Sequence, residues 1–359
     1  MRLERIVALG VALAAVGCRA GDDAPRPAVP SEIVGGPAPE TPDVRATREL
    51  KRYVDTHVAE LASACVAICE AAPAADADGW SAAEDREDID AMRAHWRRAR
   101  AAYERIEGAI AILFPETDAD VDGRYERVIE LRADPAPFDP HGFVGMHAVE
   151  RVLWSGEIPP AVDAFERALP FYAAPRAPHD ELEARAFTSE LCARLVSDVR
   201  GMERELGPIA LDPATAWRGI HGSIEEQAEK VLLGSTGEDE SRYAAHTLAD
   251  MRANLQGGRA ALRAFAPWIE SLPEGRARLA AIEARMGTLE RAYRDAGGDA
   301  LPPVPEGFDP DAPSDAHLAT PYGRLFAIVH EASDPRAPGS LAALLRETGD
   351  ALGIPPLGR

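Results

Sequence analysis

The chain has 359 residues and a net charge of −21, with 60 acidic against 39 basic side chains. This length suits one large domain or two smaller ones. The negative charge argues against nucleic acid and anionic membrane surfaces as partners bound through charge. It is compatible with a cation ligand, although an acidic soluble surface is the simpler explanation.

The first residues have the pattern of a bacterial secretory signal. Two arginines precede a short apolar run, residues 6–16, which is too short to span a bilayer. Cys18 follows small residues as in a lipoprotein box, so residues 1–18 are predicted to be a signal and Cys18 a lipidated N-terminus; ordinary cleavage nearby is the alternative. Residues 19–46 are rich in Pro, Ala, Asp and Glu and are predicted to form a disordered tether. The protein is therefore expected to be exported and anchored to a membrane, in the periplasm or cell envelope.

Three cysteines remain beyond Cys18. Cys65 and Cys69 lie four residues apart on a predicted helix, where a disulfide between them is awkward. Either of them could pair with Cys192 in an oxidising compartment, which would leave one thiol over. The sequence leaves the pairing open, and the lack of a Cys-x-x-Cys motif argues against a zinc ribbon or a thioredoxin-type site.

The body of the chain is rich in helix-forming residues and poor in β-branched alternation, so an all-α fold is predicted. Proline clusters separate the elements. Two tandem helical bundles, residues 47–160 and 161–359, are the simplest architecture. The expected helices, in chain order, cover residues 47–71, 82–114, a segment from 124, a short segment around 147 that ends before 159, and then 180–206, 213–233, 241–265, 274–295, 322–332 and 340–352.

A histidine and a glutamate in the short segment are the first candidates for a functional site. His147 and Glu150 are three residues apart, share one helix face and border an apolar stripe. Ionisable groups beside a core are costly unless they are paired or bind a metal. The spacing alone is a chance-level match, because His57 and Glu60 repeat it on the first helix.

Three further carboxylates strengthen the prediction of a metal site. Glu107 lies inside the apolar stripe of the predicted helix 82–114, and Glu104 flanks it. Asp122 follows in a Val-Asp-Gly-Arg segment. The alternatives are a buried Glu107 paired with an arginine of another helix and an Asp122 that caps a helix or forms a turn. Helical bundles build metal sites from such side chains, and one imidazole with carboxylates suits Fe, Zn or Mn.

The Gly-x-His-x-x-Glu pattern of Gly145–Glu150 resembles the signature of the imelysin-like family. Residues 103–107 (Tyr-Glu-Arg-Ile-Glu), 121–124 and 236–246 resemble blocks of its EfeO/EfeM-type branch, which comprises periplasmic iron-uptake proteins. The short segment before the first helix leaves no room for the cupredoxin domain that some of that branch carry. The resemblance implies a pair of helical bundles with a metal site, and it implies these candidate ligands: Glu104, Glu107, Asp122, His147 and Glu150.

The resemblance also points to three weaker candidates, His246, Asp250 and Asn254. They recur every fourth residue along one face of a predicted helix, opposite an apolar stripe. A solvated polar face is the expected role for them.

Metal capture is the favoured function. A lipid-tethered domain would bind a metal ion, iron before zinc, and pass it to an inner-membrane iron permease, with no catalytic residue. The second hypothesis is a metal-dependent peptidase of the imelysin type, in which His-x-x-Glu holds zinc. The chain has no His-Glu-x-x-His motif, since His330 and Glu331 do not complete one. A non-catalytic helical surface lipoprotein is the third hypothesis.

Overall fold

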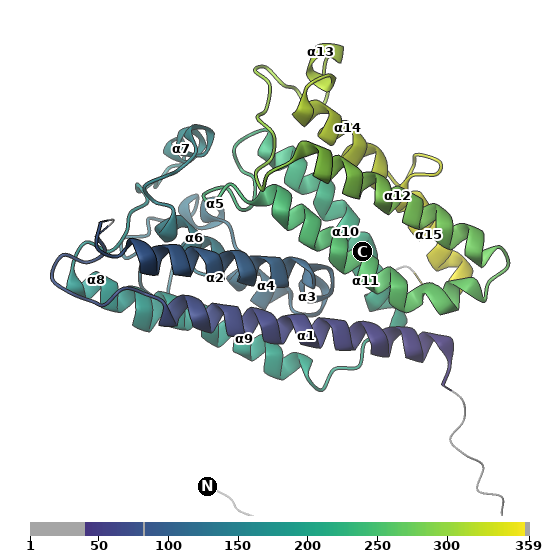
Figure 1. Ribbon diagram of the computed structural model, residues 1–359, viewed down its shortest axis with the longest axis horizontal. Coiled ribbons are helices and arrows are strands. Elements are labelled where there is room, and N and C mark those ends of the chain that lie inside the picture. The colour runs from purple at the N-terminus through teal and green to yellow at the C-terminus, as the bar shows by residue number, and fades with distance from the viewer. Residues whose placement is uncertain (1–39, 82, 356–359) are drawn as a thin grey trace, which may run out of the picture. The chain divides into compact units, whose positions relative to one another are not determined.

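The computed structural model describes residues 40–81 and 83–355 as helices joined by loops (Figure 1). Within these residues there is no strand, which confirms the predicted all-α class. The predicted signal, Cys18 and residues 19–39 of the predicted tether lie outside this part of the chain. The helical elements are α1 (Pro42–Glu70), α2 (Arg86–Glu104), α3 (Glu107–Leu113), α4 (Pro115–Val121), α5 (Tyr125–Ile129), α6 (Met146–Leu153), α7 (Pro160–Arg167), α8 (Glu181–Ala186), the π-helical turn η1 (Phe187–Cys192), α9 (Ala193–Leu206), α10 (Pro213–Gly234), α11 (Thr247–Glu270), α12 (Gly275–Ala296), α13 (Asp315–Leu318), α14 (Pro321–Ser333) and α15 (Leu341–Leu352).

The first helix forms where the sequence predicts one, but it begins at Pro42 instead of residue 47. Proline at the first helical position and aspartate in the first turn favour a helix start at Pro42 and Asp43. The last residues of the predicted tether, 42–46, are therefore helical. The apolar stripe that the sequence predicts for this helix is buried throughout, at Val54, Val58, Leu61, Cys65 and Ile68.

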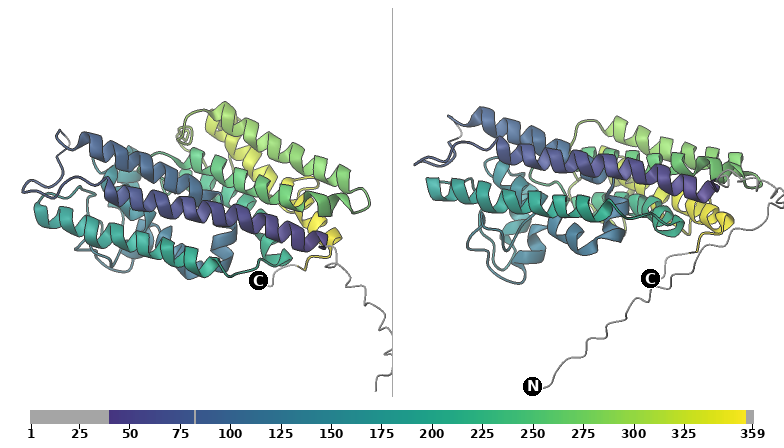
Figure 2. Two further views of the ribbon diagram at one scale, coloured as in Figure 1. Left: turned by 60° about the horizontal axis from the view of Figure 1, so that its bottom comes forward. Right: turned by 90° about the horizontal axis from the view of Figure 1, so that it is seen from below.

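Long helices build the core in two neighbouring groups (Figures 1 and 2). Helix α1 packs along α2 and α9, while α10, α11, α12, α14 and α15 pack against one another. Helix α1 also packs against α10 and α11, so the groups share an extensive contact. The predicted division of the chain at residue 160 stays a prediction, and α9 packs with the earlier helices rather than the later ones. Among the described residues, no helix is both long and apolar enough to cross a bilayer.

The predicted helix 82–114 is wrong in one respect, because it is broken between α2 and α3. Ile106 leaves helical geometry at φ −121° and ψ −7°. Helix α11 comes very close here: a Cβ atom on Gly257 would lie 2.2 Å from the carbonyl oxygen of Arg105. The missing side chain lets α11 pack on the break, so that residues of α2, α3 and α11 meet.

The predicted helix 180–206 runs as α8, η1 and α9. A π-helical turn shifts the register of the residues that follow it. Its last residue, Cys192, forms a disulfide with Cys69 of α1, with a Cα–Cα distance of 5.8 Å. This is one of the two pairings that the sequence left open. Cys65 is buried and has no disulfide partner in the described part of the chain.

Reduction of the disulfide is expected to destabilise the fold by about 2–5 kcal/mol, because Cys69 and Cys192 close a loop with a sequence separation of 123. The free energy of unfolding would be measured by guanidinium denaturation with and without reductant. A Cys65→Ala variant should keep this sensitivity, whereas Cys192→Ala should lose it. A Cys192→Ala protein that reductant still destabilises would contradict the assignment.

Candidate metal centre

Four of the five predicted ligands come together inside the fold. Glu104 comes from α2, Glu107 from the start of α3, Asp122 from the end of α4 and His147 from α6. Glu240, from the loop before α11, joins them and divides the cluster into two triads. Asp122, His147 and Glu240 present ligand atoms within 4.8 Å of one another, and so do Glu104, Glu107 and Glu240.

The position of α6 depends on a glycine and on two side chains of α2. Gly145 has a φ of +88°, and a Cβ atom there would lie 2.4 Å from the carbonyl oxygen of Asp120. Only glycine allows both this conformation and this close approach. Trp96 donates a hydrogen bond to the first carbonyl of α6, and Arg93 donates to the carbonyl of Leu153 at its end. These contacts bring His147 next to Asp122.

The imidazole of His147 is buried, with 2% of the residue exposed. Its Nδ1 lies 2.7 Å from Glu150 Oε2. Burial lowers the pKa of His147, against the opposing influence of Glu150. We assign the proton of the neutral ring to Nδ1, because the Glu150 carboxylate accepts it there. This leaves a lone pair on Nε2.

The Nε2 atom has no hydrogen-bond partner among the described residues, although Asp122 Oδ1 is 3.2 Å away. The distance is short, but the geometry is not that of a hydrogen bond. Two acceptors that face each other without a proton between them are unfavourable, and a buried polar atom without a partner is costly. A cation between His147 and Asp122 would satisfy both.

Glu150 lies behind His147 and fits a different role from the predicted one. Its Oε2 is engaged by the imidazole, and its Oε1 accepts a hydrogen bond of 2.8 Å from the backbone N–H of Ala244. Carboxylates placed in this way orient metal-binding histidines and fix their tautomer. Glu150 is therefore better suited to positioning His147 than to binding the ion itself.

Arg100 binds the carboxylates from one side. Its guanidinium donates to Glu104 and Asp122, lies 2.7 Å from Glu240 Oε1 and lies 3.4 Å from Asp250 Oδ2. The side chain is 0% exposed, so the ion pairs are not screened by water. One cation thus holds four carboxylates at fixed positions.

Lys230 of α10 binds the second triad. Its Nζ lies 3.0 Å from Glu104 Oε1 and 3.4 Å from Glu107 Oε2, and it also donates to Glu240. Glu107 additionally accepts a hydrogen bond of 2.7 Å from Asn254. The alternative role for Glu107, pairing with a cation of another helix, therefore occurs, with lysine in place of arginine.

Negative charge exceeds positive charge in this cluster. Among the described residues of the cluster, and leaving His147 aside, there are six buried or nearly buried carboxylates and two cations. The carboxylates are Glu104, Glu107, Asp122, Glu150, Glu240 and Asp250, and the cations are Arg100 and Lys230. Burial raises the pKa of Glu107 and Asp122 well above the ordinary range, so these groups take up protons more readily than exposed carboxylates do. A metal ion could take the place of such protons.

Asp122 and Glu240 form a hydrogen-bonded carboxyl pair within the first triad. Burial raises the pKa of Asp122, whereas Lys230 and Arg100 overcome the effect of burial on Glu240 and hold its pKa well below the ordinary range. Of the two carboxyl groups, Asp122 is therefore the one that takes up a proton first. Together with the Nε2 lone pair of His147, these oxygens form a donor set that fits a divalent or ferric ion.

The weaker candidates on α11 are not solvated, so the expectation of a polar face in water was wrong. His246, Asp250 and Asn254 are 7%, 0% and 1% exposed. Helix α11 packs against α2, α1 and α10, and these neighbours cover the face. Asp250 contacts Arg100, and Asn254 contacts Glu107, so both support the cluster.

The centre opens to solvent through a small acidic cavity of about 120 Å³. Four residues of the centre line it: Glu107, Asp122, Lys230 and Glu240. Further charged residues also line the cavity: Asp118, Arg124, Arg127, Glu226 and Glu229. Burial raises the pKa of Glu226 to about 7. Carboxylates outnumber basic side chains in this lining, so its charge favours a cation.

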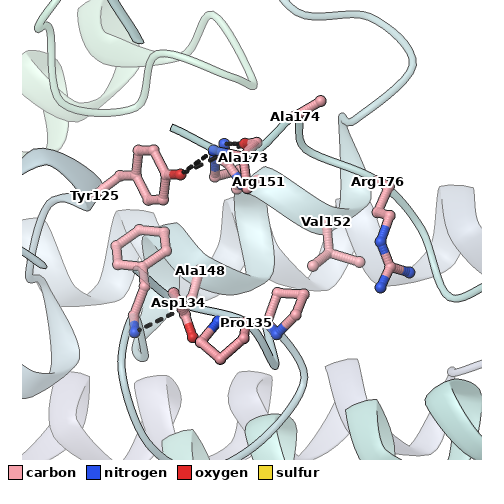
Figure 3. Close-up of a pocket in the computed structure, with 11 residues that line it drawn as sticks. Tyr125, Asp134, Pro135, Ala148, Arg151, Val152, Ala173, Ala174 and Arg176 are labelled. Carbon is pink, nitrogen blue, oxygen red and sulfur yellow. Dashed lines mark hydrogen bonds between the residues drawn. The ribbon is translucent and has the colours of Figure 1, made fainter. Parts of the chain in front are cut away.

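A second cavity, of about 180 Å³, lies beside another part of α6 (Figure 3). Ala148, Arg151 and Val152 of α6 line it, together with Tyr125. Within the part of the chain that the structure describes, none of the predicted metal ligands lines this cavity. Arg151 is engaged by Glu166 and by the carbonyl oxygen of Ala173, so its charge is already compensated.

Sequence reasoning missed Glu240, Arg100 and Lys230. Glu240 directly follows the Gly-Glu-Asp block at residues 237–239, so the motif that could have identified it ends one residue before it. Arg100 and Lys230 carried no signal, because a basic residue on a helix is ordinarily solvent-exposed.

The stability of the metal-free protein is expected to fall between about pH 4 and pH 8. Burial raises the pKa of Asp250 to about 8, against its ordinary 3.8. Between these two values the folded state keeps the Asp250 proton while the unfolded state releases it. The contribution of Asp250 to the free energy of unfolding is therefore complete below pH 4, and it is lost as the pH rises through 8. For Asp250→Asn, the free energy of unfolding should change less with pH. The difference from the wild type, summed over this pH range, should be on the order of a few kcal/mol.

Denaturation in the presence of chelator, at several pH values, would check this. The slope of unfolding free energy against pH is the readout, so a uniform stability change in the variant does not affect it. An Asp250→Asn protein with the wild-type slope would contradict the prediction.

The comparison with known proteins identifies a family. The family model described as Imelysin (Peptidase_M75) matches residues 46–311, which is most of the chain and includes every residue of both triads. No curated protein matches the chain.

Proposed function

The chain belongs to the imelysin family, and from this premise we propose that it is an exported protein that captures a metal ion. The ion would bind between His147, Asp122 and Glu240. Iron is the favoured ion and zinc the second, because one imidazole nitrogen with carboxylate oxygens suits both.

One observation carries this proposal: His147 is buried, oriented by Glu150 and left with a lone pair on Nε2 that faces Asp122. A histidine that served only the core would be expected to use both ring nitrogens. Here the carboxylate behind the ring and the free nitrogen in front of it form the arrangement that metal-binding histidines adopt.

Each neighbouring residue has a role in this proposal. Asp122 and Glu240 would give up their shared proton as the ion binds, because ligand carboxylates must be ionised. Arg100 and Lys230 would hold the carboxylates in place in the absence of the ion. The acidic cavity would attract the cation by its charge.

We further propose the cellular setting that the sequence predicts. The protein would be tethered through Cys18 outside the inner membrane and would deliver iron to a permease, as in the EfeO/EfeM-type branch. Imelysin family members are generally extracellular or periplasmic, and the disulfide between Cys69 and Cys192 suits an oxidising compartment.

A metal-dependent peptidase is the second candidate, because the name of the family contains that activity. The cavity of about 120 Å³ argues against it. It offers room for an ion with a few water molecules, whereas a peptide substrate would need to bring its carbonyl group to the buried His147.

Metal analysis of the purified full chain tests the proposal. Bound metal would be measured by mass spectrometry, and the chelated protein would be titrated with Fe(II) under nitrogen and with Zn(II). Saturation at 100 times the dissociation constant should stabilise the fold by about 2.7 kcal/mol. A metal-free protein that neither ion stabilises would overturn capture, and casein cleavage that a chelator abolishes would favour the peptidase.

A further inference from the structure

The two triads share Glu240 but differ in what already occupies them. Lys230 Nζ contacts all three carboxylates of the second triad, Glu104, Glu107 and Glu240. In the first triad, the His147 Nε2 lone pair stays available. We propose that the Lys230 ammonium takes the place of a second metal ion and limits the centre to one ion per chain, an inference that rests on the proposed function.

The geometry of the ammonium supports this substitution. Lys230 Nζ has three N–H donors, and three carboxylates lie around it, with N–O distances of 3.0 Å to Glu104 and 3.4 Å to Glu107 and a shorter contact to Glu240. The side chain is 2% exposed, so water does not replace these contacts. The ammonium is the local counter-charge of the second triad.

Glu240 has the position that a bridging carboxylate would need. Its Oε1 faces Arg100 at 2.7 Å and its Oε2 faces Lys230, while both triads include it. Two-metal sites in proteins hold their ions about 3.5–4 Å apart, and helical bundles build such sites from glutamates and histidines on facing helices. The framework thus resembles a two-metal centre in which one position is filled by a lysine.

A second observation points to the same position. Glu104 is 1% exposed, and its Oε2 lacks a hydrogen-bond partner anywhere in the described structure. Such a buried, unused carboxylate oxygen is costly. A metal ion in the second triad could use it, whereas the three donors of Lys230 are already directed at Glu104 Oε1, Glu107 and Glu240.

The ammonium and a metal ion exclude each other. Both need the same three oxygens, and two cations at one position repel each other in a site that water does not screen. Removing the ammonium group while keeping an unbranched apolar side chain should therefore open the second triad to a metal ion.

The number of Mn(II) ions per chain tests this, with Mn(II) as a probe that electron paramagnetic resonance detects. The full chain should bind one ion, and Lys230→Met should bind two, with a spectrum broadened by coupling between them. Lys230→Arg, which keeps the charge, should remain at one. Two ions in the wild type, or a folded Lys230→Met that binds no more ions than the wild type, would overturn the inference.

The outcomes separate this inference from the proposed function. If the wild type binds no ion and Lys230→Met binds one, metal capture is rejected. The inference that the lysine takes the place of a metal ion is then retained. If Lys230→Met fails to fold alone, Mn(II) added during refolding should restore the helical circular dichroism, because the ion replaces the lost charge. Failure of this rescue would also overturn the inference.

Discussion

Replacing His147 by alanine is expected to abolish high-affinity metal binding. The variant removes the nitrogen donor and leaves Asp122 and Glu240 to share their proton. Loss of a residue that merely orients a ligand lowers metal affinity about 10–100-fold, so loss of the ligand itself should cost more than that. Titration of the chelated protein with Zn(II), followed by calorimetry, measures the change.

The chain supplies matched controls for this experiment. His57 and Glu60 repeat the His-x-x-Glu spacing on α1, with Nδ1 and Oε2 3.0 Å apart, but His57 is partly exposed and belongs to neither triad. His57→Ala should leave the affinity unchanged, and Glu150→Gln should lower it by an intermediate amount. Equal affinities for His147→Ala and His57→Ala would move the metal site elsewhere.

Replacing Arg100 by methionine is expected to destabilise the fold by at least about 3–5 kcal/mol, the range for breaking a buried ion pair by removing one partner. Arg100 is fully buried and contacts four carboxylates, Glu104, Asp122, Glu240 and Asp250. Without the guanidinium, those of the four that are ionised lose a shared counter-charge. Chemical denaturation at pH 7 would measure the loss, and lower pH should reduce it because protonation removes the unpaired charges.

Arg98 offers the control on the same helix. Its side chain is 54% exposed and lies 3.6 Å from Glu60, and exposed pairs of this kind contribute about 0–1 kcal/mol. Arg98→Met should therefore leave the unfolding free energy nearly unchanged. If Arg100→Met were as stable as Arg98→Met, the cluster would not depend on Arg100 as a counter-charge.

Local patterns in the sequence predicted the helices and part of the centre. The apolar stripe around His147 predicted its burial, because the imidazole borders residues that must face the core. The stripe around Glu107 did the same, and the structure places this residue at 5% exposure. Both predictions needed only helical periodicity, which is a property of neighbouring residues.

The rest of the centre depends on contacts between distant parts of the chain. Glu240 lies in a loop, where no periodicity marks a buried residue. The residues around Asp122 predicted a helix cap or a turn for it. Its side-chain contacts instead come from other helices, with Arg100 and His147. The polar face of α11 with Asp250 is buried only because other helices cover it, and the break at Ile106 similarly follows from the approach of Gly257 to Arg105.

We propose that a metal ion binds between His147, Asp122 and Glu240. Anomalous diffraction from crystals of the full chain loaded with Fe or Zn, recorded on both sides of the absorption edge of the metal, tests this most directly. We expect one anomalous peak within coordination distance of His147 Nε2 and of the carboxylates of Asp122 and Glu240. A peak at any other position, or no peak at saturating metal, would contradict the account.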